Sequence, residues 1–534
     1  MTDRSPPTRA PDRSAVRVAV ATPLRAATEA GEAAAAAGGN ALDAALTAAA
    51  MLTVAYPHTC ALGGDLLALV REPDGSTTFI NGSGRAALAT DVAATRQGRS
   101  LMPLSGPLTV TVPGLVSGWA ALHAKGAVRS WGQALEPAID AASEGISVSR
   151  GLASSLAEDW SALVDNPGLR EVFAPTGQPL TAGRTLRQPA LARTLRSLAS
   201  GGAEALYRGV VGEELVAGLQ RLGVPLTMTD LAEHAATEQD PLELNVDGWT
   251  VYAAPPNSQG FVLLRLLGML EHTARREGGA LHERVPADVL AAAFHETAAE
   301  RDRILADPAA MTDDVPTLLS ESAFRSLLER AQGMSTTASA TAARHPHGDT
   351  AAVVSADSEG RSVSLIQSVY DSFGAQLLEP TTGIIVHNRG ACFSLDPDSP
   401  NVLAPGKRPA HTLLPALAER RDERLVVGTM GGEFQPQILL QVLSRLLSGA
   451  TPAQSVAAPR WTIGSWERDQ PSTTLNRESD TDPGLLPLFR DWPGPLIELP
   501  SGSSQVGHAQ AIRVCGDELT SGTDPRADGH TIEP

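Results

Sequence analysis

The sequence has little cysteine, few aromatic residues and no long hydrophobic run. Three cysteines among 534 residues exclude a disulfide-stabilised scaffold, and they are too widely spaced for a zinc knuckle. Aromatic residues make up 4% of the chain, so its core must consist mainly of Ala, Val and Leu. No stretch of about 18 uncharged apolar residues is present, so we expect no membrane-spanning helix. The N-terminal sequence lacks the apolar segment of a secretory signal, and a cytoplasmic location is the resulting expectation.

The chain also has fewer basic than acidic residues. Lys and Arg total 42 against 60 Asp and Glu, a formal net charge of −18. A nucleic-acid binder needs a basic face, so this balance argues against a nucleic-acid partner. It also disfavours an anionic membrane surface as a partner. The length fits two to four ordinary domains or one large layered domain.

The first part of the chain alternates strand and helix patterns. Residues 15–21 predict a strand, and residues 27–37 and 40–51 predict two helices separated by a glycine pair, with an asparagine as the N-cap of the second. Residues 66–71 and 77–80 surround a Pro-Asp-Gly turn and predict a β-hairpin.

The pattern changes in the middle of the chain. Residues 115–330 are expected to be mainly helical, and residues 335–347 lose all periodicity and predict a mobile linker. After the linker, residues 350–356 and 362–370 alternate as two strands, and residues 436–447 follow as a helix. The second part, residues 350–534, is therefore an α/β segment.

The end of the linker carries the most informative residues. Gly348 and Asp349 are followed at once by Thr350, which begins an alternating strand. An N-terminal-nucleophile hydrolase needs this arrangement, because its nucleophile becomes the first residue of a strand after the chain cuts itself. The tripeptide by itself favours an ordinary turn. His345 and His347 form an H-x-H pair without further ligands, so we expect no metal there.

Motifs spread along the chain resemble, in the same order, those of the gamma-glutamyltransferase family. They are TEAG (28–31), GGNALDA (38–44), PH (57–58), GGD (63–65), VPG (112–114), GW (118–119), PPNS (255–258), ERDR (300–303), DP (307–308), PN (400–401), PGKRP (405–409), GG (431–432), PR (459–460) and DPR (524–526). The resemblance covers about residues 17–529.

The resemblance implies a fold and a processing event. The expected fold is a mixed α/β, four-layer αββα sandwich of the N-terminal-nucleophile hydrolase type, self-cleaved between Asp349 and Thr350. After a disordered tail (residues 1–14), residues 15–349 would form the large subunit and residues 350–534 the small catalytic subunit. The two subunits of one precursor would form one compact unit, and a homodimer is left open.

The resemblance also implies the catalytic groups. Thr350 Oγ would attack the carbonyl of Asp349, and water would release the new terminus from the resulting ester. The freed α-amine, with a reference pKa of about 7.7–8.0, could then act as the base. Ser368 matches the position whose hydroxyl contacts the nucleophile, and Gly431 and Gly432 match the glycine pair of the oxyanion hole. No cofactor or metal is implied, and uncut protein is expected to be inactive.

The sequence departs from the family at the substrate pocket. An arginine that would bind a carboxylate is displaced by two residues, and its alternative interpretation is a surface arginine. An asparagine is replaced by tyrosine, an amine-binding glutamine and aspartate by arginine and cysteine, and paired serines by histidine and threonine. The corresponding residues are Arg85, Tyr370, Arg389, Cys392, His411 and Thr412. A γ-glutamyl ammonium would meet a cation instead of a carboxylate, which is unfavourable in sign.

These departures resemble the divergent oxamate amidohydrolase and acylase-like branch, as do the strings SLIQSVY (364–370) and NRG (388–390). The branch implies a small-molecule substrate with an oxalyl-like or other small acyl group, cleaved at an amide or a C–C bond. One such role is 4-alkylproline formation in antibiotic biosynthesis. The alternatives are a true γ-glutamyl transferase or hydrolase acting on glutathione-like substrates, and an uncleaved, inactive homologue that acts as a binding protein.

Overall fold

The computed structural model describes most of the chain. The described ranges are 16–273, 281–333, 349–466, 470–489 and 492–529. The predicted tail (residues 1–14) and the predicted linker (335–347), with His345 and His347, lie outside the described residues.

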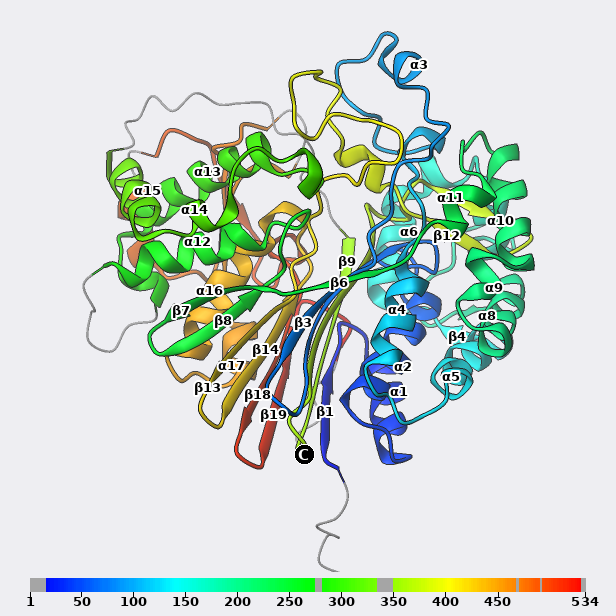
Figure 1. Ribbon diagram of the computed structural model, residues 1–534, viewed down its shortest axis with the longest axis horizontal. Coiled ribbons are helices and arrows are strands. Elements are labelled where there is room, and N and C mark those ends of the chain that lie inside the picture. The colour runs from blue at the N-terminus through cyan, green and yellow to red at the C-terminus, as the bar shows by residue number, and fades with distance from the viewer. Residues whose placement is uncertain (1–15, 274–280, 334–348, 467–469, 490–491, 530–534) are drawn as a thin grey trace, which may run out of the picture.

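Two six-stranded antiparallel sheets form the centre of the molecule (Figure 1). The first sheet has the strand order β1 (Val18–Ala21), β9 (Asp349–Asp357), β10 (Ser362–Tyr370), β2 (Asp65–Arg71), β3 (Thr77–Asn81) and β6 (Thr237–Gln239). The second has the order β19 (Glu518–Thr523), β18 (Ala509–Cys515), β14 (Glu423–Thr429), β13 (Ala416–Arg420), β8 (Trp249–Ala253) and β7 (Leu242–Val246). Both sheets combine strands from before and after Thr350, so the two parts of the chain share one framework.

Helices cover the outer face of each sheet. Helices α1 (Arg25–Ala36), α2 (Ala41–Ala55), α4 (Leu115–Ala124) and α5 (Trp131–Glu144) belong to the layer on the first sheet. Helices α12 (Gly260–Glu271), α13 (Ala287–Ile304), α15 (Glu321–Gly333), α16 (Gln435–Leu447) and α17 (Pro452–Ala457) form the layer on the second. The expected four-layer αββα order is confirmed.

Shorter elements surround these layers. The further helices are α3 (Val92–Arg96), α6 (Arg150–Leu163), α7 (Pro167–Phe173), α8 (Pro189–Gly201), α9 (Glu204–Tyr207), α10 (Val210–Arg221), α11 (Met228–Ala232) and α14 (Val315–Leu318). The further strands are β4 (Ile146–Ser147), β5 (Thr185–Leu186), β11 (Leu377–Glu379), β12 (Ile384–Val386), β15 (Trp461–Ile463), β16 (Leu475–Glu478) and β17 (Leu496–Leu499). The chain also forms short 3₁₀ helices, among them η4 (Arg389–Cys392) and η5 (Gly432–Phe434).

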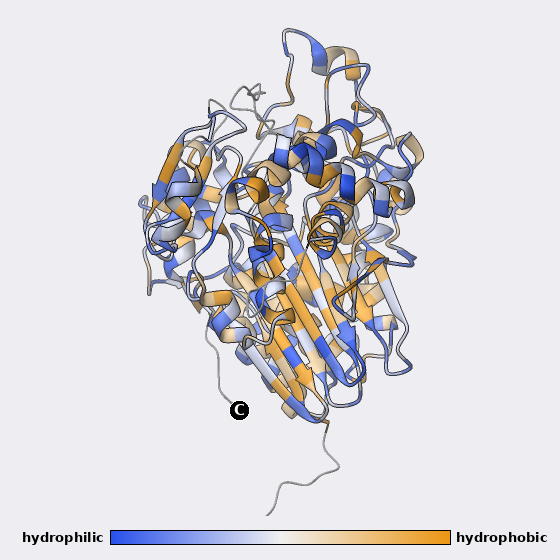
Figure 2. Ribbon diagram, turned by 90° about the vertical axis from the view of Figure 1, so that its left-hand side faces the viewer, coloured by the Kyte–Doolittle hydropathy of each residue, from blue (hydrophilic) through white to orange (hydrophobic). Residues whose placement is uncertain are grey.

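The central strands are buried on both faces. In β9, Ala352 and Val354 belong to the core between the sheets, whereas Ala351 and Val353 belong to the core against the first helical layer. This follows from the two-residue period of a strand, which sends successive side chains to opposite faces. Figure 2 shows hydrophobic residues following the strands of the stacked sheets. The same alternation places the Thr350 side chain on the inter-sheet face, at the end of β9.

Local signals predicted several of these elements correctly. The hairpin is β2–β3, and Asn40 caps α2, accepting hydrogen bonds from the N–H groups of Leu42 and Asp43. The predicted strands and helix after Thr350 are also confirmed, as β9, β10 and α16.

Residues 115–330 are mainly helical, as expected, but the strands within this region were not predicted. Strands β7 and β8 lie in this region and form the edge of the second sheet. They are joined by Asp247 and Gly248, both with positive φ (50° and 79°), as in the two-residue Asp-Gly hairpin turns that favour such dihedrals. That dipeptide between alternating residues was the signal that the helical interpretation missed.

Within the described ranges, no helix is both long and apolar enough to cross a membrane.

Candidate active site

Thr350 and Ser368 lie opposite each other on neighbouring strands. Their side chains share one face because β9 and β10 pair in the register Thr350↔Ser368. Thr350 Oγ1 donates to Ser368 Oγ over 3.2 Å, and Ser368 Oγ donates to the carbonyl oxygen of Asp349 over 2.6 Å. A chain of hydrogen bonds therefore leads from the predicted nucleophile, through Ser368, to the carbonyl of the predicted scissile bond.

A β-bulge aims these groups. The register shifts between Ser368 and Tyr370, so that Tyr370 lies opposite Asp349. Tyr370 has a φ of 79°, a conformation that costs a bulky residue about 1–3 kcal/mol and is found mainly at functional sites. Its N–H donates to Ser368 Oγ over 2.7 Å, so the strained backbone fixes the serine hydroxyl.

The predicted oxyanion glycines form a turn between β14 and α16. Gly431 and Gly432 have φ values of 136° and 51°, which favour glycine. A Cβ on Gly431 would also lie 2.5 Å from Ile438 Cδ1. Among the described residues, the N–H groups of Gly431 and Gly432 have no backbone or side-chain acceptor. Two unused donors in a turn are the arrangement that an oxyanion requires.

Arg301 fixes this turn from the large part of the chain. Its guanidinium donates to the Glu433 carbonyl over 3.1 Å and pairs with the Glu433 carboxylate at 2.8 Å. It also donates to Gln259 Oε1 over 3.1 Å, and Gln259 Nε2 donates to the Gly432 carbonyl over 3.0 Å. Arg301 pairs with Asp302 as well, at 2.7 Å. Its charge is therefore used in positioning the glycine turn.

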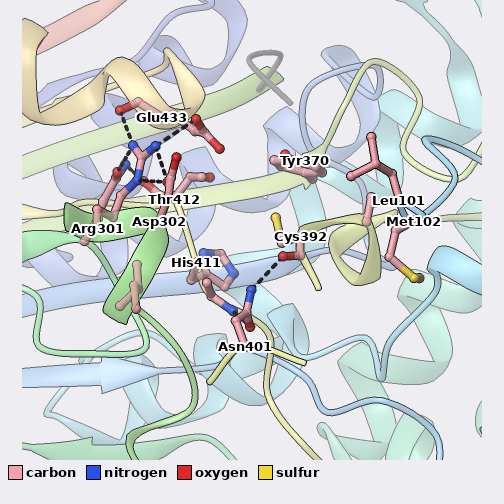
Figure 3. A pocket seen from close by; sticks show the side chains of 14 residues that line it. Leu101, Met102, Arg301, Asp302, Tyr370, Cys392, Asn401, His411, Thr412 and Glu433 are labelled. Carbon is pink, nitrogen blue, oxygen red and sulfur yellow. Dashed lines mark hydrogen bonds and ion pairs between the residues drawn. The ribbon is translucent and has the colours of Figure 1, made fainter. Parts of the chain in front are cut away.

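A pocket with about 570 Å³ of free space opens beside these groups (Figure 3). We call it the acyl pocket. Four predicted substrate-binding residues line it, namely Tyr370, Cys392, His411 and Thr412. Gln259, Arg301, Asp302 and Glu433 contribute to the same wall. The structure thus brings together these residues from six separate segments of the sequence.

A buried carboxylate lies behind this pocket and was missed as a functional residue. Asp65 Oδ2 is 3.1 Å from His387 Nδ1, 3.0 Å from His411 Nε2 and 3.5 Å from Arg389 Nε. All four side chains are fully buried. We call Asp65, His387, Arg389 and His411 the acyl-pocket cluster. The Gly-Gly-Asp motif contains Asp65, but its partners are more than three hundred residues away.

The acyl-pocket cluster corrects one electrostatic expectation. Arg389 does not present an isolated cation to the substrate, because Asp65 lies against it. Burial would raise the pKa of Asp65, but His387 and His411 outweigh burial and keep that pKa well below its usual range. Burial, followed by the charge of Arg389, lowers the pKa of His411 to about 4, so His411 is neutral at pH 7.

Arg389 influences the pocket through the side chains that it contacts. Its Nη1 donates to Thr412 Oγ1 over 3.0 Å and contacts Cys392 Sγ at 3.7 Å. Its guanidinium carbon lies 4.3 Å from the centre of the Tyr370 ring, within cation–π range. Arg389 Nη2 and Tyr370 Oη are buried without a hydrogen-bond partner among the described residues. Burial raises the pKa of both Tyr370 and Cys392, so both are protonated near neutral pH.

Arg85 does not line the acyl pocket. It contacts Asp307 at 3.4 Å and donates to the Gly406 carbonyl over 2.9 Å. Its side chain is 46% exposed, which corresponds to the surface-arginine alternative. Ser83, which aligns with the expected arginine, is buried and donates to Asn81 Oδ1.

No group of three or more His, Cys, Asp or Glu side chains in the described ranges is arranged to hold a metal ion.

The fold and the site together define a class of protein. A threonine at the start of a central strand, a serine beside it and a glycine turn, all within a four-layer αββα sandwich, are the features of N-terminal-nucleophile hydrolases. The gamma-glutamyltranspeptidase family model matches residues 27–533, so the chain belongs to that family.

Individual relatives agree with this assignment. The chain is 37% identical over 505 residues to the oxamate amidohydrolase proenzyme of Klebsiella pneumoniae, covering 92% of this chain and 94% of that one. It is 34% identical over 509 residues to the glutathione hydrolase-like YwrD proenzyme of Bacillus subtilis, covering 93% and 94%. The crystal structure of cephalosporin acylase from Bacillus halodurans matches with a TM-score of 0.86 and 30% identity, covering 100% of this chain and 99% of that one. The expected resemblance to an amidohydrolase and acylase-like branch is confirmed.

Proposed function

We propose that this protein cuts itself before Thr350 and then hydrolyses a small acyl amide through a Thr350 acyl-enzyme. The observation that supports this most directly is the hydrogen-bond chain from Thr350 through Ser368 to the Asp349 carbonyl. The names of its relatives add support, because those relatives are proenzymes, an amidohydrolase among them.

The self-cleavage step follows from that chain of hydrogen bonds. Thr350 Oγ bonds to the Asp349 carbonyl carbon while Ser368 accepts the threonine proton and gives its own proton to the carbonyl oxygen. The tetrahedral carbon then releases the Thr350 nitrogen, which takes up a proton and becomes an amine. Water hydrolyses the remaining ester, leaving an α-carboxylate on Asp349 and a free hydroxyl on Thr350.

The same residues would then act on a substrate. The new α-amine of Thr350 removes the proton from its own hydroxyl, directly or through a water, and Oγ attacks the substrate carbonyl. The N–H groups of Gly431 and Gly432 stabilise the resulting oxyanion, a contribution of about 2.7–4 kcal/mol per donor in comparable sites. Water completes the cycle by hydrolysing the acyl-enzyme.

The chemistry of the acyl pocket favours an acyl group rich in acceptor oxygens. Tyr370 Oη is a buried, protonated donor without a partner among the described residues. Thr412 Oγ1 already accepts from Arg389, so its hydroxyl proton is directed elsewhere. An oxalyl-like group, with a carbonyl beside a carboxylate, supplies acceptors for both. This chemistry fits an amide or a C–C bond next to such a group, including the 4-alkylproline step of antibiotic pathways.

A γ-glutamyl substrate is the weaker candidate. Its ammonium would need acceptors, yet Glu433 and Asp302 are paired with Arg301. Cys392 stands where the family has an aspartate, and its thiol is protonated because burial raises its pKa.

Intact-mass spectrometry and a substrate panel would test the proposal. Wild-type protein and Thr350→Ser should give two fragments that meet between Asp349 and Thr350, whereas Thr350→Ala should stay whole. The cut protein should release ammonia from oxamate, or amine from another oxalyl amide, faster than it releases aniline from a γ-glutamyl anilide. An uncut wild-type chain after prolonged incubation at neutral pH would overturn the self-cleavage step. Faster turnover of the glutamyl compound would overturn the substrate assignment.

A further inference from the structure

A second and larger pocket lies on the other side of the reacting groups. It has about 1,880 Å³ of free space, and we call it the second pocket. At two places in the chain, residues close together in sequence line different pockets. Tyr370 lines the acyl pocket and Asp371 the second, while Glu433 lines the acyl pocket and Met430 the second.

Asp349, the residue before the predicted scissile bond, also lines the second pocket. Thr350 follows Asp349, and the two glycines lie between Met430 and Glu433. The nucleophile and the oxyanion turn therefore stand in the partition between the pockets. A substrate whose carbonyl is at Thr350, with its acyl half in the acyl pocket, has the second pocket available for its leaving half.

The charge of the second pocket has one sign. Glu158, Asp159, Asp349 and Asp371 are among its lining residues, and no Lys or Arg is among those that the structure describes. After self-cleavage Asp349 becomes a chain end, and the other three carboxylates stay in place on α6 and after β10. A site of this charge attracts cations and repels carboxylates.

Two buried histidines line the second pocket, and each has a ring nitrogen without a hydrogen-bond partner among the described residues. His58 is 3% exposed and His508 is 8% exposed, and both line the pocket. His58 Nδ1 and His508 Nε2 have no hydrogen-bond partner among the described residues. Burial lowers the pKa of His58 to about 3 and that of His508 to about 4, so both rings are neutral at pH 7. Neutral imidazole nitrogens beside carboxylates are suited to accept hydrogen bonds from an ammonium group.

We propose that the second pocket binds the leaving half of the substrate and selects a leaving group that carries a cationic amine. This inference rests on the proposed amide hydrolysis. In that reaction the Thr350 Oγ–carbon bond forms and the substrate C–N bond breaks. The leaving nitrogen takes the proton that the Thr350 α-amine removed from its hydroxyl. A second ammonium farther along the leaving half then lies among Glu158, Asp159 and Asp371.

Calorimetric binding of two small amine mimics tests the pocket without relying on turnover. Self-cleaved protein should bind 1,3-diaminopropane, a dication, and bind the neutral isostere 1,3-propanediol far more weakly. Each of the substitutions Asp159→Asn and Asp371→Asn should weaken diamine binding about two- to fivefold, the range for partly exposed ion pairs. The matched control Asp140→Asn removes an exposed carboxylate on α5, and should leave binding unchanged. Circular dichroism confirms that each variant is folded.

A pair of substrates extends the test to catalysis. The oxalic acid mono-amides of 1,3-diaminopropane and of n-butylamine have leaving halves of equal length but different charge. The cationic amide should have the lower KM, and Asp159→Asn should reduce that difference. Equal binding of the diamine and the diol to cut protein, or diamine binding that is unaffected by both substitutions, would overturn the inference. If the wild-type chain stays uncut while carboxylate-dependent diamine binding is seen, the proposed function fails and the pocket assignment stands.

Discussion

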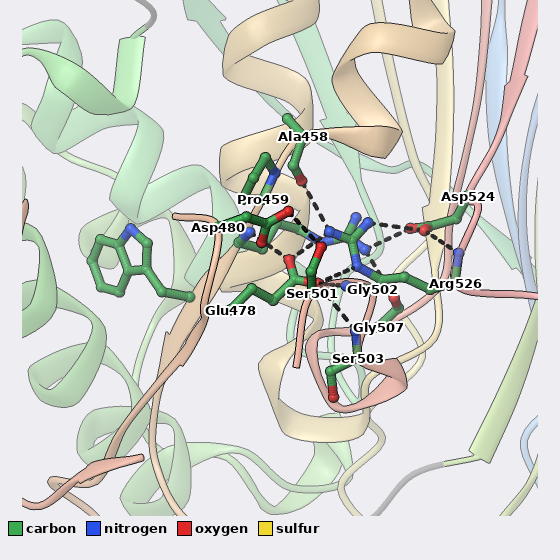
Figure 4. Close-up of polar contacts among 12 residues, drawn as sticks. Ala458, Pro459, Glu478, Asp480, Ser501, Gly502, Ser503, Gly507, Asp524 and Arg526 are labelled. Carbon is green, nitrogen blue, oxygen red and sulfur yellow. Dashed lines mark hydrogen bonds and ion pairs between the residues drawn. The ribbon is translucent and has the colours of Figure 1, made fainter. Parts of the chain in front are cut away.

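Two buried charge clusters in this molecule differ in how many carboxylates stand against their basic groups. The acyl-pocket cluster places one carboxylate, Asp65, against one arginine and two histidines. A second group, which we call the C-terminal cluster, consists of Arg460, Glu478, Asp524 and Arg526. Figure 4 labels the last three of these residues. The C-terminal cluster has two carboxylates for two arginines, and Glu478 also accepts from the backbone N–H groups of the loop at residues 502–503.

We interpret the C-terminal cluster as a structural network and, under the proposed function, the acyl-pocket cluster as part of the substrate site. In the C-terminal cluster, several of the remaining arginine donors reach backbone carbonyls, including that of Gly507 from Arg460 and that of Ala458 from Arg526. Arg460 Nε is buried without a hydrogen-bond partner among the described residues. Such a network fixes chain segments to one another. In the acyl-pocket cluster, Arg389 Nη2 and the adjacent Tyr370 Oη remain without partners among the described residues. Unpaired buried donors are costly, and the proposed function assigns the substrate acyl group as the partner of those beside the acyl pocket.

The largest expected effect concerns the serine beside the nucleophile. Ser368→Ala should slow self-cleavage by about 10²–10⁴-fold, the usual contribution of a positioned proton-transfer group. The matched control is Ser364→Ala, four residues earlier on the same face of β10, where Ser364 Oγ donates to the Val427 carbonyl. The fraction of cut chain over time, measured by mass spectrometry, should separate the two variants. Equal rates would remove Ser368 from the reaction.

Removing the carboxylate from each cluster tests the comparison directly. Asp65→Asn and Asp524→Asn should each lower the free energy of unfolding by about 3–5 kcal/mol, because each leaves a buried arginine without its partner. Urea unfolding of the two variants measures this loss.

Only the variant in the acyl-pocket cluster should also change substrate preference. Asp65→Asn exposes the substrate to the uncompensated charge of Arg389, so KM for an anionic acyl group should fall relative to that for a neutral one. In the folded fraction of the Asp524→Asn variant, the ratio of the two KM values should be unchanged. A changed ratio in both variants would show that the C-terminal cluster is not merely structural.

The smallest effect is a difference in pH dependence between two aspartates, Asp349 and Asp524. Burial, together with Asp371 and Asp159, raises the pKa of Asp349 from 3.8 to about 7. The folded, uncut chain therefore retains a proton that the unfolded chain releases. This stabilisation is complete below the unfolded pKa and is lost as the pH rises through about 7. The pH dependence of stability that Asp524 contributes has the opposite sign, because Arg460 and Arg526 outweigh burial and lower the pKa of its carboxyl group.

Urea unfolding of uncut Thr350→Ala protein between pH 4 and pH 8 measures how the free energy of unfolding depends on pH. The double variant Thr350→Ala/Asp349→Asn should lose less stability as the pH rises over that interval. Parallel curves for the two proteins would show that Asp349 titrates normally.

Local sequence patterns predicted what depends on near neighbours. The Asn40 cap, the β2–β3 hairpin and the alternation of β9 and β10 follow from residues a few positions apart. Family motifs supplied Thr350, Ser368 and the glycine turn. The structure places Thr350 opposite Ser368, and it places the glycine turn next to Glu433, which lines the acyl pocket. The assignment of catalytic and binding roles to these residues stays a prediction until the variants are measured.

Tertiary structure decided how the charges are paired. Nothing near Asp65 in the sequence indicates that it lies against His387, Arg389 and His411, since these contacts arise where separate strands and loops meet. The same holds for the fixing of the glycine turn by Arg301 and for the partition between the two pockets. The order of amino acids was enough to indicate the class of fold, the candidate nucleophile and the departures from a glutamyl site. The three-dimensional arrangement determined the charge that a substrate would meet, because electrostatic energy depends on distances in space and on burial.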